Sequence, residues 1–172
     1  MKYYIIAGEA SGDLHGSNLM KALLKEDNKA DIRFWGGDLM LAVGGNLVMH
    51  YKERQFMGFA EVIFNLRKIT GHIKFCKSDI ESFQPDVIIF IDNSGFNLRI
   101  AKWAKTQQFK THYYISPQVW ASRAGRVEKI KRDIDAMYCI LPFEKEFYQT
   151  FVAAYKKMGN AKKEKFYRKK IQ

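Results

Sequence analysis

Polar residues that could take part in catalysis or binding follow directly after the apolar run at residues 86–91. Residues 86–91 read DVIIFI, and residues 92–97 read DNSGFN. The carboxylate of Asp92 would lie at the mouth of a buried strand, partly shielded from water, where a carboxylate can act as a general base. Asn97 could bind a substrate hydroxyl or cap the helix that follows. Asp92 is therefore our candidate catalytic residue, and the alternative is that Asp92 only caps a turn.

The turn at residues 8–13, GEASGD, is a second candidate and follows the apolar run at residues 2–7. Its two glycines allow backbone conformations that other residues resist. A helix starting here presents free N–H groups and its positive dipole end, which suit a phosphate, a sugar hydroxyl or a carboxylate. The alternative is that Ser11 or Asp13 caps that helix, and the turn has neither a P-loop lysine nor a GxGxxG pattern. The candidate substrate-binding residues here are Gly8, Glu9, Ser11, Gly12 and Asp13.

A third group follows the strand-like residues 111–115. Pro117 restricts the chain there, and the flat face of Trp120 could pack against a sugar ring, although a tryptophan is as often part of a core or an interface. The candidate substrate-binding residues of this group are Ser116, Gln118 and Trp120. A helix with five basic residues follows, which could attract phosphate or form a solvated face. These basic residues are Arg123, Arg126, Lys129, Lys131 and Arg132.

Large apolar side chains gather at residues 56–66, near a predicted helix start. Phe56, Met57 and Phe59 have several basic residues around them, which indicates an apolar surface with a cationic rim. Such a surface suits acyl chains or a bilayer interface. The alternative is that most of this stretch, Phe59 included, is the core face of a helix.

Strand-like and helix-like segments alternate along the chain. This predicts a Rossmann-like α/β fold, with a parallel sheet, right-handed crossovers and helices on both faces. Ligands of such sheets bind at the carboxyl ends of the strands, so the turns after residues 7, 91 and 115 should form the site. The predicted strands are residues 2–7, 31–35, 47–49, 86–91, 111–115 and 136–141. The predicted helices are residues 14–25, 39–43, 58–83 with a break near Thr70 and Gly71, 98–106, 123–132 and one that opens at Pro142.

Length and composition indicate one folded domain. The chain has 172 residues, of which 47% are hydrophobic and 27% charged, and we expect the domain to span residues 1–150. Much of the net charge of +11 falls in a basic tail, residues 151–172. Such a tail could meet nucleic acid or anionic lipid, or could simply be solvated. We expect no nucleic-acid partner.

Cysteine and histidine spacing gives no sign of a metal site. The two cysteines and four histidines match no metal-ligand pattern, so we expect neither a metal nor a cofactor. The apolar start of the chain is too short for a signal peptide, and no stretch approaches the roughly 20 apolar residues of a membrane span. The expected location is therefore the cytoplasm, and contact with a membrane surface stays possible.

Five segments, in this order and spacing, resemble the lipid A disaccharide synthase family of glycosyltransferases. The match covers residues 1 to about 148, and several ordered segments are more specific than any one of them. The resemblance implies the N-terminal, acceptor-binding domain of a GT-B type enzyme, in which two Rossmann-like domains face a cleft. The segments are AGEASGD (7–13), FMGFAEV (56–62), IDNSGFNLRIAK (91–102), YISPQVWA (114–121) and LPFEKEFY (141–148).

The family transfers 2,3-diacylglucosamine from its UDP derivative to 2,3-diacylglucosamine 1-phosphate. The product has an inverted, β(1→6) linkage, and the step belongs to lipid A synthesis at the inner face of the inner membrane. By resemblance, Asp92 would be the base for the attacking hydroxyl, and Glu9, Ser11 and Asp13 would position the sugars. Phe56 and Met57 would receive acyl chains or rest on the membrane. No metal ion is implied.

The resemblance ends near Tyr148, and the family's chain is roughly twice as long. Residues 151–172 do not align, so we expect the donor-binding domain to be absent and the chain to be inactive alone. Apolar surface normally covered by a second domain would then favour self-association. One alternative is a non-catalytic module that binds an acylated sugar or a membrane surface. A further alternative is a different Rossmann-like enzyme that binds a nucleotide through residues 8–13.

Overall fold

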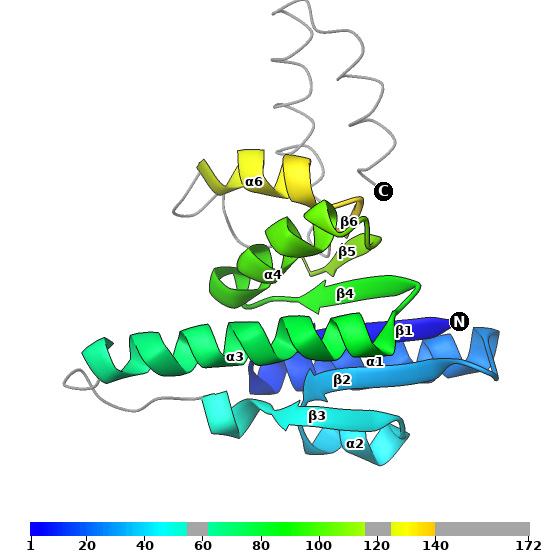
Figure 1. Ribbon diagram of the computed structural model, residues 1–172. Helices are drawn as coiled ribbons and strands as arrows, with labels where there is room; N and C mark the ends of the chain where they lie inside the picture. Colours follow the sequence, from blue (N-terminus) through cyan, green and yellow to red (C-terminus); the bar gives the residue numbers. More distant parts are fainter. Residues whose placement is uncertain (55–61, 116–124, 140–172) are drawn as a thin grey trace, which may run out of the picture.

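The computed structural model describes residues 1–54, 62–115 and 125–139, and six strands within them form one sheet (Figure 1). The strand order is β3-β2-β1-β4-β5-β6, and every pairing is parallel. The predicted Rossmann-like α/β fold is therefore confirmed. The strands are β1 (Lys2–Ala7), β2 (Asp31–Gly36), β3 (Asn46–His50), β4 (Val87–Ile91), β5 (Thr111–Tyr114) and β6 (Ala136–Tyr138).

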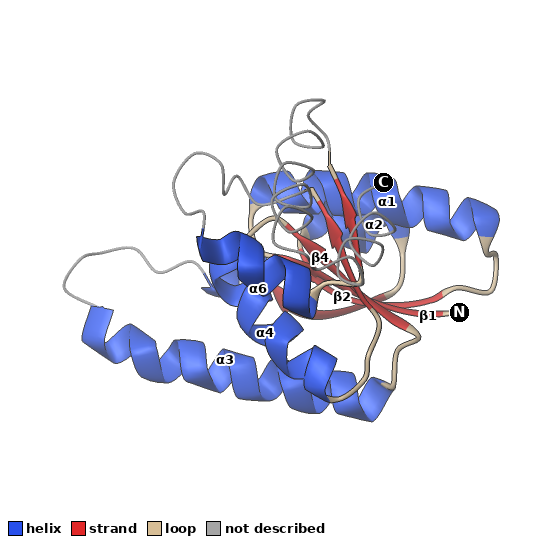
Figure 2. Cartoon of the chain, turned by 90° about the horizontal axis from the view of Figure 1, so that it is seen from above, coloured by secondary structure: helices blue, strands red, loops and turns tan. Residues whose placement is uncertain are grey.

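Helices cover both faces of the sheet, as the view from above shows (Figure 2). α1 and α2 lie on one face, and α3, α4 and α6 lie on the other. Each face buries its own apolar cluster, so the core consists of two layers separated by the sheet. The helices are α1 (Ala10–Glu26), α2 (Asp38–Val43), α3 (Val62–Phe83), α4 (Ser94–Thr106) and α6 (Gly125–Asp133), with a 3₁₀ turn, η1 (Tyr51–Arg54), after β3.

The central strands β1 and β4 are the most deeply buried part of the sheet. All five residues of β4 are buried, and in β1 only Lys2 is exposed. Successive side chains of a strand point to opposite faces. Tyr4 and Ile6 accordingly join the cluster under α3 and α4, whereas Tyr3 and Ile5 join the cluster under α1 and α2. An uninterrupted apolar run is typical of a strand covered on both sides, which is why residues 86–91 could be recognised as a strand.

Helix α3 is continuous through Thr70 and Gly71, so the predicted break there is wrong. A glycine costs about 1 kcal/mol relative to alanine in a helix interior. Cys76 and Ile80 of the same helix are fully buried against the sheet, and such tertiary packing outweighs local propensity. A Cβ atom at position 71 would meet nothing within 4 Å among the described residues, so the glycine leaves no gap in the described core.

A buried polar network ties α3 to the sheet. The Tyr4 hydroxyl donates to Asp79 Oδ2 at 2.7 Å, and Trp35 Nε1 donates to the Tyr4 hydroxyl at 2.8 Å. Arg33 binds the Asp79 carboxylate through Nε and Nη2, with the Nε to Oδ2 distance at 2.8 Å. Burial raises the pKa of the Tyr4 phenol, so it stays protonated and serves as a donor. The network joins β1, β2 and α3 with its donors and acceptors paired.

The strand order reverses direction between β1 and β4, which makes this pair the topological switch point. Ala7 pairs with Ile91 at the last register position of the two strands. The residues that follow, from Gly8 and from Asp92, therefore leave the sheet side by side at its carboxyl edge. In open parallel sheets, ligands bind at this place.

Candidate functional site

Two turns meet at the switch point, and glycines make the contact possible. A Cβ atom on Gly8 would lie 1.9 Å from Asn93 Nδ2, and one on Gly12 would lie 3.2 Å from the Ala7 Cβ. Within the described residues, the glycines with positive φ are Gly44 and Gly45, not Gly8 or Gly12. The two glycines of the GEASGD turn therefore provide close approach rather than the unusual backbone angles that we predicted.

The turn after β4 holds Asp92 in an uncommon backbone conformation. Asp92 has φ 47° and Asn93 has φ 40°, both in the left-handed region. The Asp92 carbonyl oxygen accepts a hydrogen bond from Asn97 Nδ2 at 2.8 Å and another from the Tyr113 hydroxyl. Two donors from α4 and β5 thus fix the peptide that carries the Asp92 side chain. Backbone angles of this kind cost about 1–3 kcal/mol each and are concentrated at functional sites.

The Asp92 side chain is partly exposed at the carboxyl edge of the sheet. Its carboxylate makes no hydrogen bond or ion pair with any group in residues 1–54, 62–115 and 125–139. The N-cap of α4 is Asn93, without a side-chain cap. The geometry therefore gives no support to the alternative that Asp92 caps a turn, and it leaves the carboxylate available to a proton donor.

Asn97 stabilises the turn after β4 through hydrogen bonds from its buried side chain. Its side chain is fully buried, and Nδ2 also lies 3.2 Å from the Ile91 carbonyl oxygen. Asn97 Oδ1 has no hydrogen-bond partner among the described residues. Because no part of the side chain reaches the surface, we interpret Asn97 as a residue that positions Asp92, in place of the predicted contact with a substrate hydroxyl.

Asp13 is also structural rather than exposed. Its side chain is 3% exposed, and its carboxylate accepts hydrogen bonds from the backbone N–H groups of Gly37 at 2.8 Å, Leu39 at 3.0 Å and Met40 at 3.1 Å. These groups form the N-terminus of α2. Asp13 therefore caps α2 and not its own helix, which contradicts the alternative that Asp13 caps α1. Its contribution to a ligand site is to hold the GEASGD turn in place.

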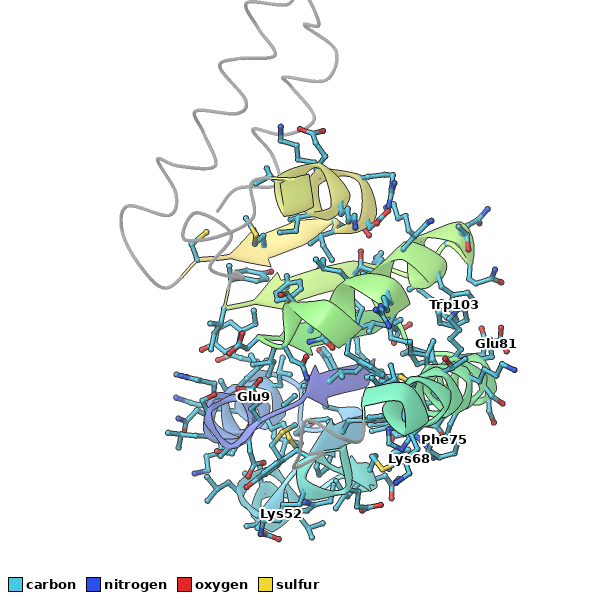
Figure 3. All side chains as sticks on the ribbon, turned by 90° about the vertical axis from the view of Figure 1, so that its left-hand side faces the viewer. Glu9, Lys52, Lys68, Phe75, Glu81 and Trp103 are labelled. Carbon is cyan, nitrogen blue, oxygen red and sulfur yellow. The ribbon has the colours of Figure 1, made fainter. Side chains whose placement is uncertain are left out.

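The start of α1 is left open at the switch point. Glu9 and Ser11 are exposed, and the N-cap residue Glu9 makes no side-chain cap. Figure 3 looks onto the carboxyl ends of the strands and shows Glu9 beside the start of α1. Asn93, the N-cap of α4, makes no side-chain cap either. Two helix N-termini without side-chain caps thus flank Asp92, and such N-termini bind anionic or hydroxyl groups through their N–H groups and dipoles.

A further strained residue follows β5. Ile115 has φ 66°, which is a rare value for a β-branched residue, and its N–H donates to the Tyr138 carbonyl at 3.1 Å. The positive φ values of Gln84 and Gln108 instead follow the ends of α3 and α4, where left-handed residues are common. The strained positions Asp92, Asn93 and Ile115 thus all lie at the carboxyl edge.

Several predicted site residues lie outside the described part of the chain. They are Phe56, Met57, Phe59, Ser116, Gln118 and Trp120, together with the tail at residues 151–172. Within the described ranges, His, Cys, Asp and Glu side chains form no group of three that could hold a metal ion. The helices described there include none long and apolar enough to cross a membrane.

Sequence reasoning missed two residues that shape the site. Tyr113 binds the Asp92 carbonyl, and Asn93 packs its side chain on Gly8. Tyr113 lies on the strand THYY, where alternation places its side chain on the face opposite that of Tyr114. That alternation predicts burial, but no local signal shows that the hydroxyl reaches the neighbouring turn.

The fold places the chain in a known structural class. The UDP-GlcNAc 2-epimerase of Neisseria meningitidis bound to UDP-GlcNAc matches 87% of this chain and 43% of its own, with a TM-score of 0.62 and 9% identity. The UDP-GlcNAc 2-epimerase of Methanocaldococcus jannaschii matches 87% of this chain and 42% of its own, with a TM-score of 0.54 and 13% identity. The domain therefore has the Rossmann-like fold of one half of a GT-B type protein.

Sequence comparison identifies the family. Residues 3–159 match the family described as lipid-A-disaccharide synthetase, so the chain belongs to that family. The lipid-A-disaccharide synthase of Geobacter metallireducens is 45% identical over 145 residues, which is 84% of this chain and 38% of that protein. The enzyme of Chromohalobacter salexigens is 40% identical over 148 residues, or 86% of this chain and 38% of that protein. The chain thus spans about two fifths of the length of these relatives.

Proposed function

We propose that this chain is the acceptor-binding domain of a lipid A disaccharide synthase. In the proposed reaction, 2,3-diacylglucosamine passes from its UDP derivative to 2,3-diacylglucosamine 1-phosphate, and UDP is released. The observation that carries the proposal is the Asp92 carboxylate, which is partly exposed and unpaired among the described residues. It stands at the β1–β4 switch point between two helix N-termini without side-chain caps.

Asp92 is the proposed general base. Its carboxylate takes the proton of the acceptor 6-hydroxyl as that oxygen bonds to the anomeric carbon of the donor. The bond from the anomeric carbon to the UDP oxygen breaks, UDP leaves with the electron pair, and the anomeric centre inverts to the β(1→6) link. Hydrogen bonds from Asn97 and Tyr113 to the Asp92 carbonyl support this role, because they fix the peptide that carries the carboxylate.

The other predicted residues take supporting roles in this proposal. Glu9, Ser11 and the N–H groups at the start of α1 bind hydroxyl groups of the acceptor sugar. Ser116, Gln118 and Trp120 form a further wall of the site. Phe56, Met57 and Phe59 contact acyl chains or the bilayer. We place the protein at the cytoplasmic face of the inner membrane, because both proposed substrates carry acyl chains.

A chimera tests the proposed base. Residues 1–148 of this chain, joined to the remaining part of the Geobacter metallireducens relative, should release UDP when both lipid substrates are supplied. Asp92→Asn in the chimera should lower the rate on the order of 10²- to 10⁴-fold, because removing a general base has effects of that size. Residues 1–148 without the added part should release no UDP above background.

Asp38→Asn is the matched control. Asp38 has a side chain that is 72% exposed at the start of α2, where it pairs with Lys52 at 3.4 Å. Its loss should leave the UDP release of the chimera within about twofold, as expected for a surface ion pair. An Asp92→Asn chimera with undiminished UDP release would remove Asp92 from the mechanism.

A further inference from the structure

Helices α4 and α6 enclose a groove whose lining residues do not include Asp92. Both helices lie on the same face of the sheet (Figure 2), and the groove between them has a volume of about 370 Å³. That volume falls within the range of small-molecule sites. The lining residues are Ser94, Gly95, Leu98, Arg99 and Lys102 of α4 and Lys129, Arg132 and Asp133 of α6.

The groove carries an excess of positive charge even though Arg132 and Asp133, two of its lining residues, neutralise each other. Asp133 is 2% exposed, and both of its oxygens accept hydrogen bonds from Arg132 at 2.6 Å. Arg99, Lys102 and Lys129 form no ion pair with any acidic side chain in the described ranges. Three exposed cations therefore line one groove, and the Asp133 carboxylate among the lining residues is already paired with Arg132. Their mutual repulsion would be relieved by a bound anion.

Lys131, another basic residue of α6, does not contribute its charge to the groove. Lys131 is 8% exposed, and its Nζ lies 3.2 Å from Glu128 Oε1. Lys131 is thus neutralised within its own helix and does not line the groove. The residues left for a ligand are those that face α4.

The N-terminus of α4 also lines the groove. Ser94 and Gly95 are the first two residues of α4, and the N-cap Asn93 has no side-chain cap. A Cβ atom on Gly95 would meet nothing within 4 Å among the described residues. The positive end of the α4 dipole and the three cations therefore favour the same kind of ligand.

We propose that the α4–α6 groove binds a phosphate ester. Arg99 offers a planar guanidinium that can hold two phosphate oxygens, and Lys102 and Lys129 add point charges beside it. The volume suits one phosphorylated head group, whereas nucleic acid is bound along extended basic surfaces. The phosphate could be carried by an anionic lipid in a bilayer or by a soluble sugar. The groove would bind it whether or not the chain takes part in glycosyl transfer.

The experiment uses the full 172-residue chain and two triple variants of equal charge. The groove variant carries Arg99→Gln, Lys102→Gln and Lys129→Gln. The control variant carries Lys21→Gln, Lys25→Gln and Lys29→Gln, three exposed lysines on or just after α1, on the other side of the sheet. Both sets lie on the surface, and circular dichroism with thermal unfolding checks that each variant folds.

Binding of a phosphate ester is measured in two arms, and binding of a single-stranded oligonucleotide is measured for comparison. Sedimentation with phosphatidylcholine vesicles, with and without phosphatidic acid, tests a lipid phosphate. Titration with glucosamine 1-phosphate, followed by calorimetry, tests a soluble one. We expect the groove variant to lose affinity on the order of tenfold or more in at least one arm, and the control variant to change less than about twofold. The arm that responds identifies the source of the phosphate.

Three outcomes would overturn the proposal. Equal losses in the two variants would mean that general surface charge binds the vesicles or the sugar phosphate. Unchanged affinity of the groove variant in both arms would leave the groove without a ligand of this class. A loss confined to binding of a single-stranded oligonucleotide would assign the groove to nucleic acid instead.

Discussion

Contacts with neighbouring residues fix the backbone conformation of Asp92 and Asn93 at the carboxyl edge of the sheet. The Asp92 peptide takes up φ 47° because Asn97 and Tyr113 both bind its carbonyl oxygen. Asn93 follows at φ 40°, and its side chain packs on Gly8. Asparagine and aspartate tolerate the left-handed region better than other non-glycine residues. Residue type and tertiary contact therefore act together to fix this turn.

Gly8→Ala should destabilise the chain by about 1–3 kcal/mol, because an added methyl group forces a shift in a packed contact. The new Cβ would lie 1.9 Å from Asn93 Nδ2 and 2.9 Å from the Asn93 Cβ. Chemical denaturation measures the loss. In a background of Asn93→Gly, which removes that side chain and accepts a positive φ, the same change should cost much less. Equal costs in both backgrounds would show that the two residues do not meet.

At the scale of elements, one carboxylate sets the position of a neighbouring helix. Asp13 lies in the first turn of α1, yet it satisfies three N–H groups at the start of α2. It therefore links the turn after β1 to the turn after β2. Because α1 and α2 share one face of the sheet, this link aligns the exposed start of α1 with the switch point.

Asp13→Ala should lower the free energy of unfolding by about 1–3 kcal/mol, since it removes a helix cap and leaves buried donors unpaired. Urea denaturation followed by circular dichroism measures this loss. Asp38→Ala is the comparison, because Asp38 also lies in the first turn of α2 but its side chain is 72% exposed. It should cost less than about 1 kcal/mol. A smaller loss for Asp13 than for Asp38 would contradict the assigned cap.

For the whole molecule, the outer strands β5 and β6 depend on an acidic residue for their attachment. Asp135 precedes β6, and its Oδ2 accepts hydrogen bonds from the Thr111 N–H at 3.0 Å and the Thr111 hydroxyl at 3.1 Å. Lys105 of α4 binds the other oxygen. Burial alone would raise the Asp135 pKa, but the hydrogen bonds from Lys105 and Thr111 outweigh it and the pKa is lowered.

A lowered pKa in the folded state means that the charged carboxylate stabilises the fold. This contribution is fully present above the ordinary aspartate pKa of about 3.9 and is lost as the pH falls through the lower folded value. Asp135→Asn should therefore reduce the thermal midpoint by a constant amount from pH 7 down to about pH 5. The difference from the unsubstituted chain should shrink below about pH 4. A difference that grew on acidification would reverse the assigned sign.

The amino-acid sequence alone determined the class of fold and predicted the sheet edge at which the candidate site lies. Apolar runs such as residues 86–91 and the turn residues after them are local patterns, and parallel sheets place such turns together. The sequence also singled out Asp92 and the GEASGD turn. It placed the start of α4 at residue 98 rather than at Ser94, because Ser94, Gly95 and Asn97 in the first turn are weak helix formers.

Only the tertiary structure decided what several of these residues do. Asp13 and Asn97 carry polar side chains typical of a binding site. In the folded chain both are buried and form hydrogen bonds with backbone groups of other elements. The α4–α6 groove likewise depends on Arg99 and Lys129, which are thirty positions apart and face each other only because α4 and α6 pack on one side of the sheet. Local patterns report backbone preference and amphipathicity. The partner of a side chain depends on contacts between distant segments, which exist only once the chain has folded.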